Sequence, residues 1–287
     1  MNAYHYIKVI YNMKFNDKIH NLLGLRLNIE TFNASLKELL KLNNYSSFAR
    51  TEILIMFGAT TLGVLWQPLT VSVIVFGVGF IFSSLFNIPS KEYIPFFAIS
   101  LVLWQFLVAN MNEFSSKFSR PGEYLNFPYP KLILYLISII SKNTFILILN
   151  LSVVLGTFII TGHKVSFLSW LFAIYGLFLY VLFIFGVGVV ISILGSRFSD
   201  IPNIVQNFIQ IMFYITPVMW TPNSINKNWV YEYNPLYYAL SLVRDPLIYQ
   251  SFSSLFYIIS SCLILLIWIF ALLFWSMFAW RINYHGK

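Results

Sequence analysis

Residue types that could carry catalysis or ion coupling are few in this chain, and they are scattered. The four histidines are His5, His20, His163 and His285, and neither they nor the one cysteine, Cys262, show metal-ligand spacing. A single cysteine permits no disulfide within the chain. No glycine-rich phosphate-binding loop of the Walker type occurs. We therefore expect no metal, no cofactor and no nucleotide hydrolysis in this chain.

Three carboxylates in the predicted loops could take part in acid–base chemistry. They are Glu92, Glu232 and Asp245, which are far apart in sequence. A membrane-embedded glycan-processing enzyme needs a carboxylate or an arginine cluster beside a sugar phosphate, and Arg244 with Asp245 is the nearest match. Adjacent opposite charges more often stabilise a structure than catalyse. We interpret this pair as holding a local hairpin and assign no catalytic residue, with the enzyme kept as an alternative.

The composition is that of a chain embedded in lipid. Of its 287 residues, 59% are hydrophobic and 10% are charged, and the mean hydropathy is +0.75. Soluble domains carry about 25% charged residues. The net charge of +8 could suggest nucleic acid, but the basic residues gather in the N-terminal region and in short loops. The sequence predicts a multi-pass membrane protein that binds no nucleic acid.

Long apolar stretches predict an all-α fold with six transmembrane helices, because about 20 apolar residues cross the hydrocarbon core. The six spans are expected at residues 62–86, 94–111, 132–160, 167–194, 203–220 and 256–280. They form a permease domain of residues 53–287 that follows a cytoplasmic tail of residues 1–52.

An amphipathic helix is predicted in this N-terminal tail. Ile29, Phe32, Leu36, Leu39 and Leu40 recur at helical spacing between charged residues. Such a helix is suited to lying in the membrane interface. The alternative is a soluble helix that packs on a partner protein.

The orientation follows from the positive-inside rule. With both termini on one side, fourteen of the eighteen lysines and arginines lie on that side and four on the other. The sequence therefore predicts that both termini are cytoplasmic.

The stretch from Arg197 to Leu247 is the part around which the other spans are arranged. It contains a span that breaks at Pro217 and Pro222, then a short apolar segment, residues 237–243, that cannot cross a bilayer. Backbone that dips into lipid and returns must be covered by protein or line a water-filled cavity. We predict a broken, re-entrant hairpin at the outer membrane face, residues 221–250, beside an exit path.

Aromatic and polar residues concentrate at this hairpin. The candidate gate and path residues are Phe213, Tyr214, Trp220, Trp229, Tyr231, Tyr233, Asn234, Pro235, Tyr237 and Arg244. Aromatic faces suit weak, sliding contacts with sugars. The alternative is the interfacial belt of tryptophan and tyrosine that occurs in any membrane protein.

Five of the six predicted spans contain no Asp, Glu, Lys, Arg or His, which argues against a proton- or ion-coupled carrier. Lys142 is the exception, and we expect it to extend to the cytoplasmic interface. The energy for transport is then expected to come from another subunit.

Four segments in chain order resemble the membrane subunit of ABC polysaccharide exporters, the permeases that move O-antigen, capsule or teichoic-acid chains. They read GVLWQPL, RPGEYLNFPYPKLILYL, GSRFSDIPNIVQNFIQIMFYITPVMW and NPLYYALSLVRDPL, and the resemblance covers residues 30–287. It implies a homodimer of six-span subunits in a bacterial inner membrane, with two copies of an ABC ATPase subunit that binds ATP and Mg²⁺. The alternative within the same superfamily is an exporter of a drug or a lipid.

The resemblance also implies that the outer hairpin, residues 221–250, contains short re-entrant gate helices between spans five and six, and it implies roles for particular residues. The loop of residues 119–131 resembles the element that couples the permease to the ATPase, through Arg120, Pro121, Gly122, Glu123, Tyr124, Phe127 and Pro128. The alternative is a plain connecting turn.

The implied substrate is a glycan on polyprenyl pyrophosphate among membrane lipids. The cations available for its pyrophosphate are Lys37, Lys41, Arg50 and Arg197. The chain departs from the family before the first span, where it reads ILIMFGATT instead of several arginines.

Overall fold

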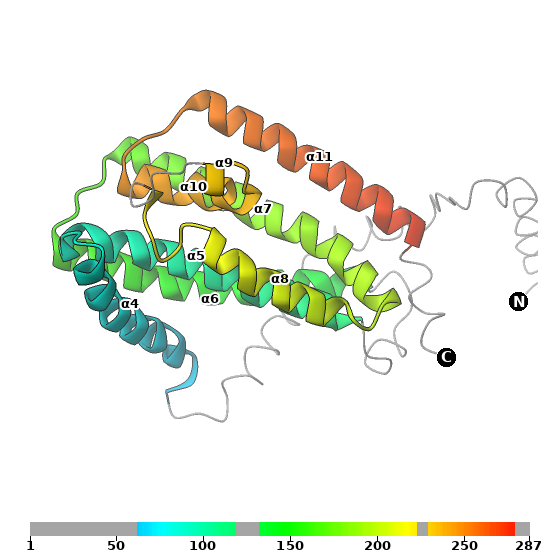
Figure 1. Cartoon of the computed structure of the whole chain (residues 1–287). Coiled ribbons are helices and arrows are strands. Elements are labelled where there is room, and N and C mark those ends of the chain that lie inside the picture. Colours follow the sequence, from blue (N-terminus) through cyan, green and yellow to red (C-terminus); the bar gives the residue numbers. More distant parts are fainter. Residues whose placement is uncertain (1–61, 119–131, 223–228, 279–287) are drawn as a thin grey trace, which may run out of the picture.

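The fold is all helical in the part that the computed structural model describes, residues 62–118, 132–222 and 229–278 (Figure 1). This agrees with the predicted all-α class. The helices are η1 (Gly63–Leu65), α4 (Trp66–Leu85), α5 (Ser90–Lys117), α6 (Leu132–Thr161), α7 (Phe167–Arg197), α8 (Ile201–Ile215), α9 (Trp229–Glu232), α10 (Pro235–Ile248) and α11 (Ser254–Phe278).

Five described helices are long and apolar enough to cross a membrane: η1 with α4, α5, α6, α7 and α11. They match five of the six predicted spans, and they make the chain a multi-pass membrane protein. The predicted tail helix and the boundary at residue 52 lie outside the described residues.

The fifth predicted span, residues 203–220, is shorter in the structure than expected. Helix α8 ends at Ile215, and Thr216 adopts an extended backbone with φ −82° and ψ 135°. Thr216 precedes Pro217, and a proline disfavours helical geometry in the residue before it. The 15 residues of α8 are about 22 Å long, less than the ~30 Å of hydrocarbon. The predicted span of residues 203–220 therefore stays a prediction, and with it the total of six.

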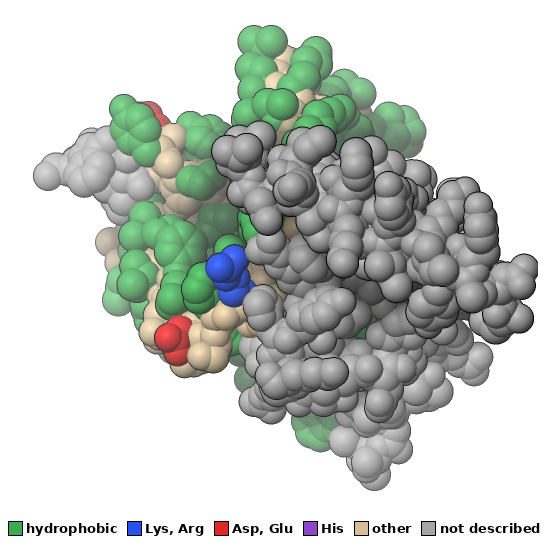
Figure 2. All heavy atoms as spheres, turned by 90° about the vertical axis from the view of Figure 1, so that its right-hand side faces the viewer, with side chains coloured by type: hydrophobic (Ala, Val, Ile, Leu, Met, Phe, Trp, Pro, Cys, Tyr) green, Lys and Arg blue, Asp and Glu red, His purple; other side chains and the backbone are tan. Residues whose placement is uncertain are grey.

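Helix α5 lies at the centre of the bundle. Helices α4, α6, α7, α8 and α10 all pack against it (Figure 1), and 83% of its most apolar stretch is buried. By contrast, α11 is mostly exposed and packs mainly on α7. Figure 2 views the end that carries the α7–α8 turn, where the described side chains are mostly hydrophobic and few are charged.

Lys142, which was predicted to extend to the cytoplasmic interface, forms an ion pair between α5 and α6. Its Nζ lies 2.6 Å from Glu113 Oε2, and its side chain is 11% exposed. Asn143 donates to Oε1 of the same carboxylate at 3.4 Å and to Asn110 at 3.3 Å. The sequence placed Glu113 in a loop, but α5 continues through Lys117 and so brings a carboxylate to α6. A charge within a helical bundle is less costly when it is paired and hydrogen-bonded.

Helices α7 and α10 approach each other closely at Gly176. A Cβ atom added there would overlap the backbone carbonyl of Leu242, which cannot move alone, whereas one added at Gly77 would meet nothing within 4 Å. We expect Gly176→Ala to destabilise the protein by about 1–3 kcal/mol through overpacking. Gly77→Ala should leave the melting temperature of the detergent-solubilised protein nearly unchanged, and equal melting temperatures for the two variants would contradict this packing.

Candidate functional site

The candidate site is the segment between α8 and α11, which contains the short helices α9 and α10. It lies at the end of the bundle where α4 meets α5 and where α6 meets α7 (Figure 1). Asn234 begins α10 as its N-cap: its side chain accepts from the backbone N–H of Leu236 at 2.9 Å, and Pro235 follows at the first helical position. Both residues are typical of helix starts.

Arg244 is the electrostatic centre of this segment and is fully buried. Its guanidinium donates to the carbonyl of Pro217 at 2.7 Å, to Asp245 Oδ1 at 3.1 Å and to Ser241 Oγ at 3.3 Å. It also lies 5.1 Å from the ring centroid of Phe96 and 5.4 Å from that of Tyr237. A buried arginine needs such partners, and they connect α10 to the turn after α8 and to α5.

Two further contacts hold the turn after α8. Asn234 donates to Thr216 Oγ1 at 2.8 Å, and the hydroxyl of Tyr93 on α5 donates to the carbonyl of Met219. The end of α8 is therefore held by both α5 and the start of α10. Sequence reasoning missed Tyr93 and Thr216, because neither has a pattern that indicates a partner more than ten residues away.

We expect Tyr93→Phe to lower the free energy of unfolding by about 1–2 kcal/mol, because the Met219 carbonyl loses its donor. Tyr233→Phe serves as the control, since Tyr233 is 86% exposed. Unfolding in detergent, followed by tryptophan fluorescence, measures the difference. Equal values for the two variants would mean that the Tyr93 hydroxyl contributes nothing.

The aromatic residues predicted at the hairpin form a chain of ring contacts. The ring of Tyr231 lies 6.0 Å from Trp220 and 4.9 Å from Tyr237, which in turn lies 5.2 Å from Tyr238. Trp220 also donates to the carbonyl of Tyr214 at 3.0 Å. Rings at these separations attract each other more strongly than their buried area alone would give. The turn after α8, helix α9 and the start of α10 therefore form one aromatic cluster.

Other predicted path residues differ in their surroundings. Phe213 packs inward, with its ring 5.6 Å from that of Trp104 on α5, whereas Tyr214 is 67% exposed. Trp229 lies in α9, and its side chain is outside the described part of the chain. Burial raises the pKa of Tyr249 to about 12, and burial followed by the charge of Asp245 raises that of Tyr237. Both hydroxyls remain protonated donors at neutral pH.

A polar stripe on α8 is the main feature that sequence reasoning missed. Asn203, Gln206, Asn207 and Gln210 recur at i, i+3, i+4 and i+7, so they lie on one helix face. All four are exposed, and Tyr214 continues the stripe to the hairpin. We call these five residues the α8 stripe. The helical spacing of these polar residues is visible in the sequence and could have predicted the stripe.

A side-chain amide has two donors and an acceptor, which suits a partner that both donates and accepts. Facing lipid, such groups would be costly, and polar residues within membrane proteins usually face the bundle interior or a water-filled cavity. The α8 stripe can therefore bind hydroxyl-rich or hydrated material along the length of the helix.

Several predicted site residues are not brought to this cluster. Arg197 ends α7 at the opposite end of the bundle from α10, 5.6 Å from the ring of Phe198 (Figure 1). The remaining predicted pyrophosphate contacts and the whole coupling segment lie outside the described residues: Lys37, Lys41, Arg50, Arg120, Pro121, Gly122, Glu123, Tyr124, Phe127 and Pro128. Their roles stay predictions.

Residues 44–248 match the family model described as ABC-2 type transporter. Two similar relatives are each named O-antigen export system permease protein RfbA, from Klebsiella pneumoniae. One is 24% identical over 64% of this chain and 72% of the relative. The other is 25% identical over 68% of this chain and 76% of the relative. Members of this family are membrane subunits of transporters, and this chain belongs to the ABC-2 type transporter family.

Proposed function

We propose that this chain is the permease subunit of an ATP-driven exporter that moves a lipid-linked polysaccharide across a bacterial inner membrane. The observation that carries the proposal is the α8 stripe, which leads to the aromatic cluster at Trp220, Tyr231 and Tyr237. Amides bond to sugar hydroxyls and rings stack on sugar faces, and each such contact is weak enough for a polymer to slide. The relatives named as O-antigen export permeases support this substrate class.

The two-sided character of α8 supports a homodimer. One face packs on α5 through Ile209, which is 7% exposed, while the α8 stripe faces away from this protomer. In a lipid bilayer, a second copy that presents its own stripe would enclose a polar path between the two protomers. Both termini are placed on the cytoplasmic side, as the distribution of basic residues favours.

Energy comes from two copies of an ABC ATPase subunit that binds ATP and Mg²⁺. Residues 119–131 transmit its movement, and Lys37, Lys41, Arg50 and Arg197 contact the pyrophosphate of the polyprenyl carrier at the inner leaflet. The outer hairpin then opens by loosening the contacts that hold the turn after α8. A drug or another apolar substrate would gain nothing from a stripe of amides, which disfavours that alternative.

Co-expression with the ABC ATPase encoded in the same gene cluster tests the proposal. We expect a stoichiometric complex of two permease and two ATPase chains, whose ATP hydrolysis in nanodiscs rises when lipid-linked polysaccharide is added. A monomeric permease that binds no ATPase under gentle extraction would contradict the proposal. Turnover of a lipid-linked sugar by the permease alone would favour the enzyme.

A further inference from the structure

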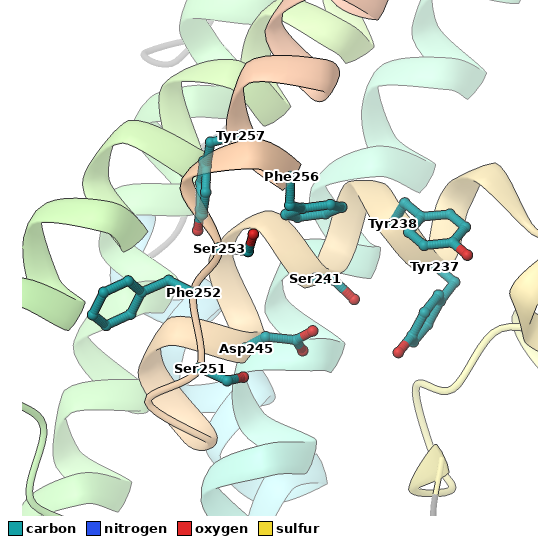
Figure 3. A pocket seen from close by; sticks show the side chains of 9 residues that line it. All are labelled: Tyr237, Tyr238, Ser241, Asp245, Ser251, Phe252, Ser253, Phe256 and Tyr257. Carbon is teal, nitrogen blue, oxygen red and sulfur yellow. The ribbon is translucent and has the colours of Figure 1, made fainter.

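Two adjoining cavities lie on the side of the bundle formed by α7, α10 and α11, away from the α8 stripe. The larger is an apolar groove of about 760 Å³ between these three helices. The smaller, of about 370 Å³, is lined by aromatic rings, serine hydroxyls and one carboxylate, and it lies where α10 turns into α11 (Figure 3). Tyr238 and Phe256 line both cavities, so the two cavities are direct neighbours.

The groove has the dimensions and the chemistry of a site for an acyl chain. Along α11 its lining runs from Phe256 to Phe270, about 21 Å at the rise of an α-helix. One leaflet of the hydrocarbon core is about 15 Å thick, so a groove of this length can hold an extended chain. The lining includes Val187 and Leu263 and only one serine, Ser260. Sugars would leave their hydroxyls unpaired in such surroundings.

The smaller cavity, which we call the headgroup pocket, supplies a carboxylate and hydroxyls. Ser241 and Asp245 of α10 and Ser251 of the α10–α11 connection direct their oxygens to the same side (Figure 3). Arg244 donates to Asp245 Oδ1 from the protein interior, and the Asp245 side chain remains 25% exposed. The carboxylate is therefore accessible to an ammonium group.

The lining of the headgroup pocket also excludes some occupants. None of the nine described residues around it is a lysine or an arginine, so these residues offer no direct cationic partner to an anionic headgroup or a pyrophosphate. Tyrosine and serine hydroxyls can donate to a single phosphate. Tyr257 is already committed, because its hydroxyl donates to the carbonyl of Leu242 at 2.7 Å.

We propose that the joined cavities bind one phospholipid with an aminoethyl headgroup, phosphatidylethanolamine. An acyl chain occupies the groove between α7, α10 and α11, the ammonium group binds the Asp245 carboxylate, and the phosphate accepts from the hydroxyls of the headgroup pocket. The lipid covers α10 on the side opposite the turn after α8. The headgroup pocket shares Tyr237 with the proposed glycan path, whereas the groove contains none of the path's aromatic residues Trp220, Tyr231 and Tyr237.

Native mass spectrometry of the full chain, released from nanodiscs of equal phosphatidylethanolamine and phosphatidylglycerol, tests the site. We expect wild-type protein to retain phosphatidylethanolamine preferentially. Ser260→Trp fills the groove and should reduce the retained lipid about tenfold. The control is Ile258→Trp, on α11 but outside the groove, which should leave the amount of retained lipid unchanged. Asp245→Asn should reduce the preference for phosphatidylethanolamine about tenfold, since charge-assisted hydrogen bonds are the stronger class. Equal retention of the two lipids by wild-type protein would overturn the proposal.

A second measurement needs no substitution. Cys262 is the single cysteine, is exposed on α11 and directly precedes Leu263, which lines the groove. A fluorophore on Cys262 should be quenched by phosphatidylethanolamine with brominated acyl chains at lower mole fractions than by the matching phosphatidylglycerol. Identical quenching curves would overturn the proposal. Oxidative cross-linking through Cys262 at high yield would also overturn it, because a second copy would then cover the groove.

Discussion

Replacing Arg244 by methionine should lower the free energy of unfolding by about 3–5 kcal/mol, the largest stability effect that we expect from a single change. Methionine fills much of the volume of the arginine side chain but donates no hydrogen bond. The Pro217 carbonyl, which accepts from the Arg244 guanidinium at 2.7 Å, would be left buried without this donor, and such a group costs about 1–3 kcal/mol. The ring contacts with Phe96 and Tyr237 would be lost as well.

The matched control is Arg197→Met, because Arg197 is exposed at the end of α7. Surface substitutions usually change stability by less than about 0.5 kcal/mol. Arg244→Lys should fall between the two, since lysine keeps the charge but lacks the planar group that reaches several acceptors. Unfolding curves in mixed detergent measure all three variants. A loss below about 1 kcal/mol for Arg244→Met would show that the turn after α8 is held without it.

The long helices could be predicted from the sequence because hydropathy and length alone determine them. The predicted span 132–160 differs by one residue from α6, Leu132–Thr161, and the predicted start of the fourth span at residue 167 coincides with that of α7. Such segments must satisfy every backbone group internally in lipid, so an apolar run of sufficient length leaves few alternatives to a helix.

The end of the span that contains α8 was predicted at Trp220, five residues too late, because the apolar composition continues to that residue. Pro217 indicates an earlier end. Lys142 has a partner that was not predicted, for a different reason. Its partner Glu113 lies 29 residues away on α5, and the pairing depends on how α5 and α6 pack. Single-residue patterns do not contain that information.

The candidate site was predictable only in part. The sequence indicated Arg244, Asp245 and the aromatic residues of the hairpin, because charges and rings are unusual beside a span. It did not indicate that the guanidinium of Arg244 would donate to Pro217, 27 positions away. The α8 stripe is the opposite case, since its spacing is visible in the sequence and the structure adds that its side chains are exposed.

The largest functional effect is expected from making the α8 stripe apolar. We expect the triple variant Gln206→Leu, Asn207→Leu and Gln210→Leu to export polysaccharide at least about tenfold more slowly. Three lost hydrogen-bonding side chains at about 0.5–1.5 kcal/mol each exceed the 1.4 kcal/mol that corresponds to a factor of ten. Assembly with the ATPase and folding should persist, because none of the three side chains is buried in the protomer.

The exposed apolar face of the same helix provides the control. Substituting Ile204→Val, Phe208→Leu and Ile211→Val changes side chains that are each more than half exposed but leaves the amides in place, so export should remain near the wild-type rate. Export is measured as surface polysaccharide in a strain that lacks the native permease.

The two possible surroundings of the α8 stripe, lipid or a water-filled path, predict opposite results for the leucine variant. If the stripe faced lipid, the leucines would stabilise the protein and export would continue, because burying an amide in hydrocarbon is costly. If it lines a water-filled path, export falls while stability hardly changes.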